Sequence, residues 1–134
     1  MLTRIIIAAL FFLTGPLSVV AQADRKAAHI VFAESMKDYG DISYGDSISY
    51  VFTFTNTGSE DLIIKNVVTT CSCTSRKYTE GPIAPGKTGE LTVSFNSGKQ
   101  DKLGRQNKVI TVLSNADNNP ERVILVCTIL EKRE

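Results

Sequence analysis

Short segments in which apolar and polar residues alternate follow one another from about residue 28 to residue 130. The clearest alternation lies between Ser47 and Thr55. Its aromatic and aliphatic residues occupy one parity and its hydroxyl residues the other, Ile48, Tyr50, Phe52 and Phe54 against Ser47, Ser49, Thr53 and Thr55. A period of two is typical of a strand with one buried and one exposed face. This segment is therefore predicted to be a half-buried strand.

Turn-forming residues separate this strand from similar segments. Clusters of asparagine, glycine and proline stand at 56–59, 83–87, 96–106 and 115–120, where they favour chain reversal. Between them we expect strands at 28–32, 62–70, 91–95, 109–113 and 123–130. Residues 62–70 are apolar on most of both sides, which predicts a central strand, and Cys71–Thr74 continues it. The pattern predicts an all-β, immunoglobulin-like antiparallel sandwich of about seven strands, with a small closed barrel as the alternative.

The last predicted strand is apolar on both sides. Val123, Leu125, Cys127 and Ile129 form one row, and Ile124, Val126 and Leu130 form the other. At the edge of a sheet, the second row would face water, so Ile124, Val126 and Leu130 form a candidate partner surface. The opening segment of the same chain, or the connection near Ala84, is the alternative cover.

The first residues have the three parts of a signal peptide. Arg4 precedes an apolar run from Ile5 to Val20, and Ala21-Gln22-Ala23 follows. The run has 16 residues and contains Gly15-Pro16, whereas a membrane-spanning helix needs about 20. We therefore predict a signal peptide at 1–23, cleaved after Ala23, and a periplasmic or secreted protein without a membrane span after cleavage.

The remaining residues, 24–134, have the length of a single domain. Removing Arg4 lowers Lys plus Arg from 15 to 14, which equals the 14 Asp plus Glu, so the net charge becomes zero. This balance argues against a nucleic-acid partner. The densest basic group, Lys99, Lys102, Arg105 and Lys108, is predicted to lie on a solvated loop.

Five motifs in a fixed order resemble a known bacterial family. They are Asp38–Ile42, Phe52–Gly58, Cys71–Thr74, Ile83–Lys87 and Val112–Asn115. From about Met36 to Leu130 the chain resembles domain-of-unknown-function family 1573, which is similar to the immunoglobulin-like domains of abnormal spindle, Hydin and major sperm protein. The resemblance implies an exported sandwich module, common in Bacteroidetes-like bacteria, with no established enzyme activity. Two features depart from the family pattern: Ser72 replaces its usual glycine, and Cys127 lies outside it.

Cys71 and Cys73 are the candidate thiol site. On an extended strand they would point to one side, where two thiols can share copper(I) or zinc. A third ligand would have to be Cys127, Met36 or His29, which the spacing does not bring near. Alternate strand residues are nearly 7 Å apart, at the limit for a disulfide, although a bend at Ser72 would shorten that distance. Simple packing of small strand-end residues remains a third interpretation.

Cys127 is predicted to be out of reach of this pair. In the expected sandwich the strands at 62–70 and 123–130 flank the strand at 109–113, so they lie about 9.5 Å apart. Cys127 is therefore expected to be buried or to face a partner.

Recognisable catalytic constellations are missing from the sequence. His29 is the only histidine and has no cysteine or serine motif beside it, and no phosphate loop, zinc-protease helix or nucleophile elbow is present. We expect no enzyme activity, no cofactor and no small-molecule ligand. The expected role is binding or scaffolding of another envelope protein, or self-association. The alternatives are a soft-metal carrier and a thiol-disulfide exchanger, both using Cys71 and Cys73.

Overall fold

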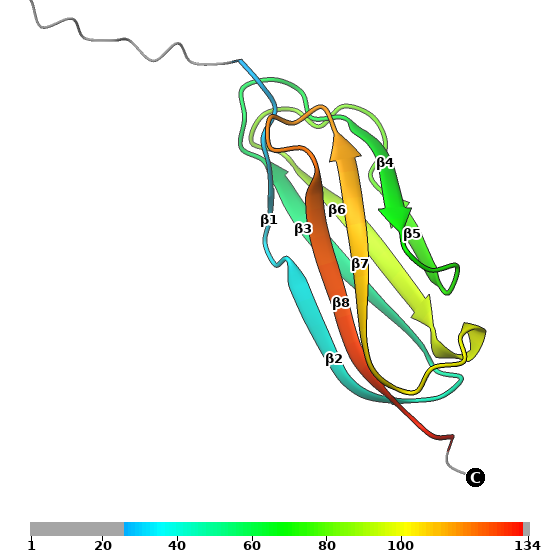
Figure 1. Ribbon diagram of the computed structural model, residues 1–134. Coiled ribbons are helices and arrows are strands. Elements are labelled where there is room, and N and C mark those ends of the chain that lie inside the picture. Colours follow the sequence, from blue (N-terminus) through cyan, green and yellow to red (C-terminus); the bar gives the residue numbers. More distant parts are fainter. Residues whose placement is uncertain (1–25, 133–134) are drawn as a thin grey trace, which may run out of the picture.

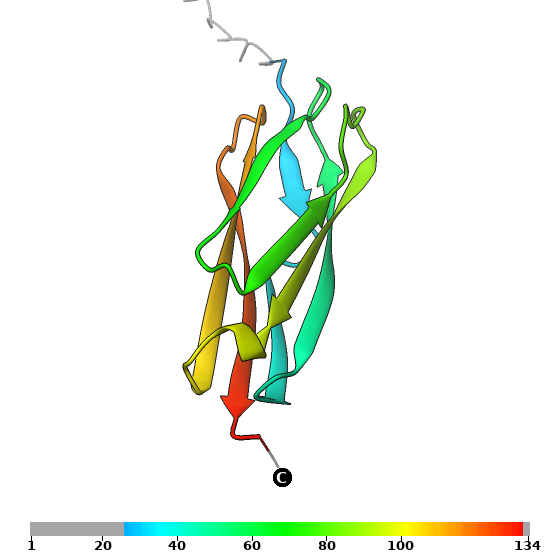
Figure 2. The ribbon, with the colours of Figure 1, turned by 90° about the vertical axis from the view of Figure 1, so that its right-hand side faces the viewer.

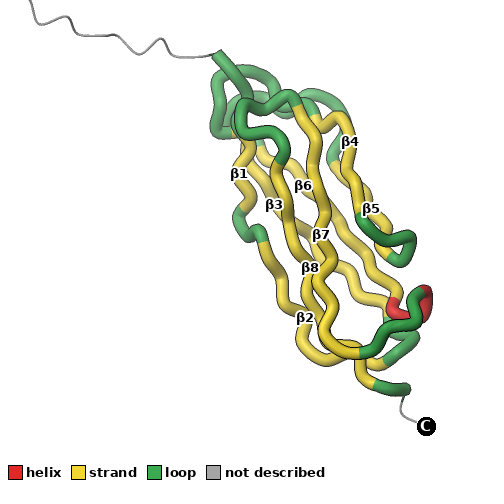
Figure 3. Tube along the Cα trace, viewed as in Figure 1, coloured by secondary structure: helices red, strands yellow, loops and turns green. Residues whose placement is uncertain are grey.

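Two four-stranded sheets pack face to face in a computed structural model that describes residues 26–132. The first sheet has the order β1-β3-β6-β5 and the second the order β2-β8-β7-β4, as Figures 1 and 2 show from two sides. The only helical element among the described residues is a short 3-10 turn, η1 (Figure 3). The elements are β1 (Ile30–Phe32), β2 (Met36–Ser43), β3 (Ser47–Asn56), β4 (Ile64–Thr69), β5 (Thr74–Tyr78), β6 (Thr88–Asn96), η1 (Ser97–Lys99), β7 (Gly104–Ser114) and β8 (Glu121–Leu130).

The inner faces of the two sheets form the core. The predicted alternation in β3 is confirmed, because Phe52 and Phe54 are buried while Ser49 and Thr53 are exposed. The inward row of β8 is buried as well, including Cys127. Two sheets that pack face to face through alternating residues form the immunoglobulin-like sandwich expected from the sequence. One strand pair, β2 with β8, is parallel, so the second sheet is mixed and not wholly antiparallel as predicted.

The opening segment of the chain belongs to both sheets. β1 pairs antiparallel with β3, and β2 then pairs in parallel with β8. The sequence pattern missed β2, since Ile42 is its only buried residue. Its pairing shifts register between Asp38 and Asp41, where Gly40 adopts a φ of 77° that favours glycine. β2 therefore covers the edge of β8 that the sequence left open.

Two expectations about residues 62–74 are wrong. β4 lies at the edge of its sheet, and its apolar outward residue Val68 stays 44% exposed. The segment after β4 turns instead of continuing the strand, and Thr74 starts β5 in the opposite sheet. The polar sequence of β5 gave no alternation from which to predict a strand.

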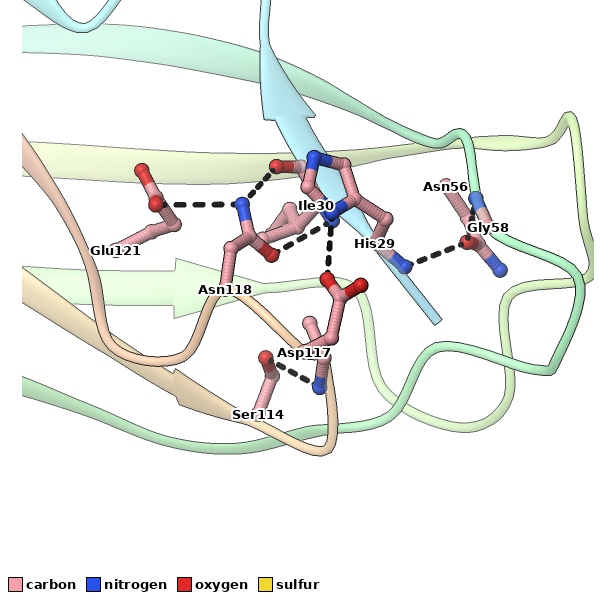
Figure 4. A network of polar contacts seen from close by, with 9 residues as sticks. His29, Ile30, Asn56, Gly58, Ser114, Asp117, Asn118 and Glu121 are labelled. Carbon is pink, nitrogen blue, oxygen red and sulfur yellow. Dashed lines mark hydrogen bonds and ion pairs between the residues drawn. The ribbon is translucent and has the colours of Figure 1, made fainter. Parts of the chain in front are cut away.

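Two asparagines, one buried and one half-buried, attach the opening segment to the loops around it (Figure 4). Asn56 is fully buried, and its side-chain oxygen accepts hydrogen bonds from the backbone of His29 and Gly58. Its amide group donates to the carbonyl oxygens of Glu60 and Ile83. Asn118 bonds both backbone groups of Ile30 in the same way. These side chains replace the sheet hydrogen bonds that irregular backbone lacks.

A methyl group at Gly58 has no room against this segment. The Cβ of an alanine there would lie 2.5 Å from the backbone nitrogen of His29 and closer still to the carbonyl oxygen of Ala27. Only glycine permits this close approach.

The predicted signal peptide, residues 1–23, lies outside the described residues. Among residues 26–132, no helix has the length and apolar character needed to cross a membrane.

Candidate functional site

Cys71, Ser72 and Cys73 form the turn that carries the chain from β4 to β5. The backbone N–H of Thr74 donates to the carbonyl oxygen of Cys71 at 3.2 Å and closes the turn. The two cysteine Cα atoms are 5.2 Å apart and their sulfurs form a disulfide. The extended geometry with two thiols on one side is therefore wrong, and the bend at Ser72 brings the sulfurs together as the alternative interpretation required. Figure 2 shows this turn between β4 and β5.

The two sulfurs have different surroundings. Cys73 is 3% exposed, whereas Cys71 is half-buried. The backbone N–H of Cys73 donates to Cys71 Sγ at 3.1 Å. Cys73 Sγ lies 3.7 Å from Gln100 Oε1 and 4.0 Å from Thr74 Oγ1. The bond thus joins a half-buried residue to a buried one.

A lysine reaches the buried side of this disulfide. Lys108 Nζ donates to Gln100 Oε1 at 2.7 Å and lies 5.0 Å from the centre of the Phe95 ring. Desolvation lowers the pKa of Lys108, and a negative charge on Cys127 would oppose that shift. Lys108 therefore does not belong to a solvated loop as predicted: it lies on β7, in register with buried Leu125.

Cys127 is a buried free thiol. Burial raises the pKa of Cys127, although the nearby Lys108 ammonium acts in the opposite direction. The strand order β8-β7-β4 places it two strands from β4, as the sequence analysis expected. A raised pKa and an apolar environment make a thiol unreactive.

The possible further metal ligands do not meet at the turn. Met36 is 56% exposed at the start of β2, Cys127 lies in the core, and His29 contacts Asp117 in the loop network of Figure 4. Within residues 26–132, no group of three or more His, Cys, Asp or Glu side chains could hold a metal ion.

The candidate partner surface on β8 is mostly covered. Val126 is only 2% exposed, while Leu130 is 41% exposed. Asp38 on β2 is in register with Val126, and Arg105 on β7 is in register with Thr128. Arg105 Nη2 and Asp38 Oδ2 are 3.4 Å apart, so this ion pair crosses the outer face of β8. Val126 is thus shielded within the chain and is not available as a partner contact, whereas Ile124 is half-buried and Leu130 stays exposed.

The free edges of the two sheets differ in regularity. β1 has three residues, and the pairings of β2 and β4 each contain a register shift. Short or bulged edges resist the addition of another strand. β5 pairs with β6 in unbroken register from Thr74 to Tyr78. It is therefore the one regular edge strand in the part of the chain that the structure describes.

Residues 30–129 match the model of a family described as a protein of unknown function, DUF1573. The chain belongs to this family. The DUF1573 sequence matches no curated protein.

Several solved structures share the fold of this DUF1573 domain. A protein of unknown function from Porphyromonas gingivalis W83 superposes with a TM-score of 0.65 at 15% identity, over 83% of this chain and 51% of that chain. The ASH or PapD-like domain 7 of human CEP192 gives a TM-score of 0.64 at 9% identity over 98% and 99% of the two chains. The periplasmic chaperone SfaE gives 0.55 at 10% identity over 78% and 60%. The DUF1573 chain thus spans about half the length of the Porphyromonas protein.

Sequence reasoning missed Gln100 and Lys108 as neighbours of the thiol pair. The inward row of β7 contains Ile110 and Val112. Extending that parity backwards by one step would have placed Lys108 on the inner face. Nothing in the sequence signalled Gln100, because its position depends on the path of the loop after η1.

Proposed function

We propose that this DUF1573 domain is an exported, non-enzymatic binding module that holds an extended segment of another envelope protein against the free edge of β5. The observation that carries the proposal is the regular, unpaired edge of this strand. Main-chain hydrogen bonds at such an edge bind an added strand, and neighbouring side chains select it.

The pairing of β5 with β6 shows which backbone groups are free. The backbone N–H of Asn96 in β6 donates to the Cys73 carbonyl oxygen, and the backbone N–H of Thr79 donates to the Glu90 carbonyl oxygen of β6. Because bonded and non-bonded pairs alternate in an antiparallel ladder, the N–H and C=O groups of Arg76 and Tyr78 point away from β6. They form a short row of donors and acceptors that a partner strand can complete.

The side chains at this edge favour an acidic partner. Arg76 and Lys77 are exposed and project to opposite faces of β5. Within one strand they place a positive charge on each side of the docking line. Complementary charge guides association and excludes unsuitable segments. The expected ligand is therefore an extended segment with glutamate or aspartate residues.

The solved structures support the architecture of the proposal and nothing finer. Their superpositions indicate a shared fold, and at identities of 9–15% they indicate the fold alone. SfaE is described as a periplasmic chaperone, which agrees with an exported immunoglobulin-like domain that contacts other proteins. The predicted signal peptide supports export. A second copy of the chain is an alternative occupant of the β5 edge.

The test uses a short synthetic peptide in which valine and glutamate alternate, titrated into the isotope-labelled domain. The backbone amide signals of Arg76 and Tyr78 should shift, and their hydrogen exchange should slow. Arg76→Pro removes an outward N–H without removing a hydrogen bond to β6 and should abolish binding, since proline is tolerated at such edge positions. Arg76→Gln keeps the N–H and should weaken binding mainly at low salt.

Three results would overturn this proposal. One is shifts confined to another strand, and a second is equal binding by Arg76→Pro and the wild-type domain. The third is concentration-dependent dimerisation through β5 that the peptide does not displace, which would assign the edge to a second copy.

A further inference from the structure

The disulfide lies directly beside the proposed docking strand. Cys73 is followed at once by Thr74, the first residue of β5. A hollow of about 210 Å³ next to Cys73 is lined by polar side chains that include Ser72, Ser75 and Lys99. A strand bound along β5 would therefore bring its own side chains to the cysteine turn.

The surroundings of the two sulfurs determine the direction of attack. An incoming thiolate has to approach along the line of the sulfur–sulfur bond and needs an accessible sulfur. Cys71 is half-buried at the surface, whereas Cys73 is 3% exposed. Because Cys71 is the more exposed residue of the two, the attack is assigned to Cys71 Sγ, and Cys73 Sγ is the sulfur that leaves.

Neighbouring groups stabilise both cysteines after the bond opens. The Cys73 N–H, 3.1 Å from Cys71 Sγ, can donate to a Cys71 thiolate, and such bonds favour the charged form. On the inner side, Cys73 Sγ and Lys108 Nζ contact the same oxygen, Gln100 Oε1, at 3.7 and 2.7 Å. A nearby ammonium stabilises a leaving thiolate, and once protonated the Cys73 thiol can donate to that oxygen.

We propose that the Cys71–Cys73 disulfide is a two-electron exchange site for a dithiol carried by an extended polypeptide bound along β5. A substrate thiolate attacks Cys71 Sγ, the disulfide breaks, and its electron pair leaves on Cys73 Sγ. The second substrate thiolate then attacks the substrate sulfur of the mixed disulfide and releases Cys71. The substrate dithiol becomes a disulfide, and the cysteine pair takes up the two electrons and the two thiol protons. The substrate class rests on the proposed function, whereas the roles of the two sulfurs do not.

The first experiment assigns the attacking sulfur. Reduced Cys73→Ser and Cys71→Ser domains, each with Cys127 also replaced by serine, react with a single-cysteine acidic peptide activated as a thionitrobenzoate disulfide. Release of the coloured thiolate should be more than about tenfold faster from the domain that keeps Cys71. Mass spectrometry should show the peptide on Cys71. Equal rates, or faster reaction at Cys73, overturn the assignment.

The second experiment tests exchange in the oxidised chain of residues 24–134 under single-turnover conditions. A valine- and glutamate-rich peptide with two cysteines should be oxidised one-for-one, and faster than by an equal concentration of oxidised glutathione. Cys127→Ser should keep this rate and Lys108→Met should slow it, with folding of both variants checked by circular dichroism. A rate no faster than with glutathione overturns the exchange site.

A backbone-methylated version of the dithiol peptide separates this inference from the proposed function. Methyl groups on its strand-facing nitrogens block pairing with β5 and leave the thiols intact. Slower oxidation of the methylated peptide supports docking along β5. Equal oxidation of the two peptides would refute docking along β5 but would still support the exchange site. Binding of the unmodified peptide at Arg76 and Tyr78 without oxidation would support the proposed binding function and refute the exchange site.

Discussion

Replacing Asn56 by alanine should remove about 3 kcal/mol of the free energy of unfolding. Asn56 is 0% exposed and its side chain makes four hydrogen bonds to backbone groups. The bond to the Ile83 carbonyl is buried. That oxygen keeps a second donor, the backbone N–H of Leu62, so the loss there is that of one buried hydrogen bond, about 1.5 kcal/mol. The other three are partly buried, so water can replace the side chain and each loss costs about 0.5 kcal/mol.

This loss is large compared with the whole stability of such a domain. Proteins of this size unfold with a free energy of about 5–15 kcal/mol. A loss of 3 kcal/mol should lower the melting temperature by on the order of 15 °C. Urea unfolding followed by circular dichroism gives the free energy, and a scan of the same variant gives the melting temperature. Asn107→Ala is the matched control, because Asn107 is exposed on the outer face of β7 and surface substitutions change stability by less than about 0.5 kcal/mol.

Asn56→Asp tests the direction of the hydrogen bonds. Aspartate keeps the acceptor for the His29 and Gly58 N–H groups but replaces the donor to the Glu60 and Ile83 carbonyls. At neutral pH two carbonyl oxygens would face a buried carboxylate, so this variant should be at least as unstable as Asn56→Ala. Acidification protonates the carboxylate and restores one donor. The difference in free energy of unfolding between the aspartate and alanine variants should therefore become smaller. An Asn56→Asp domain as stable as the wild type at pH 7 would refute this hydrogen-bond accounting.

Three further predictions follow from other positions. Gly89→Ala should lose about 1–3 kcal/mol of stability in urea unfolding, because the new Cβ would lie 2.5 Å from Cζ of the buried Phe54 ring; unchanged stability would show that the ring moves freely. A thiol reagent should label no cysteine in the native domain, Cys127 alone after unfolding without reductant, and all three cysteines after reduction and unfolding. Rapid labelling of the native domain would contradict the burial and the raised pKa of Cys127. Arg105→Gln should cost less than about 1 kcal/mol because its ion pair is exposed, yet it should increase binding of a hydrophobic dye by uncovering Val126, with Lys132→Gln as a charge-matched control.

The sequence predicted the parts of the fold where one face of a strand is buried. Phe52 and Phe54 alternate with polar residues because their sheet separates core from solvent, and the neighbouring positions of β4, β7 and β8 followed from the same sandwich pattern. β2 could not be predicted in this way. It pairs through its backbone at a bulged edge, and Ile42 alone contributes to the core.

The candidate site was predicted only in its residue types. The spacing of Cys71 and Cys73 raised the possibility of a disulfide, but only the turn at Ser72 brings their Cα atoms to 5.2 Å. A segment with apolar residues on both faces suggested a central strand, yet β4 lies at an edge and leaves Val68 exposed. Hydropathy alone cannot distinguish an edge strand from a central strand, because both can carry apolar residues on their two faces.

The parallel pairing of β2 and β8 has a mechanical consequence. The first (blue) and last (red) described segments of the chain leave the sandwich at opposite ends of its long axis (Figure 1). β2 is among the first strands and β8 is the last. Tension between the two ends would slide these strands past each other, so that the β2–β8 hydrogen bonds carry the load together and cannot open one at a time. The same geometry that covers the edge of β8 makes the domain a stiff link when it is stretched by its ends.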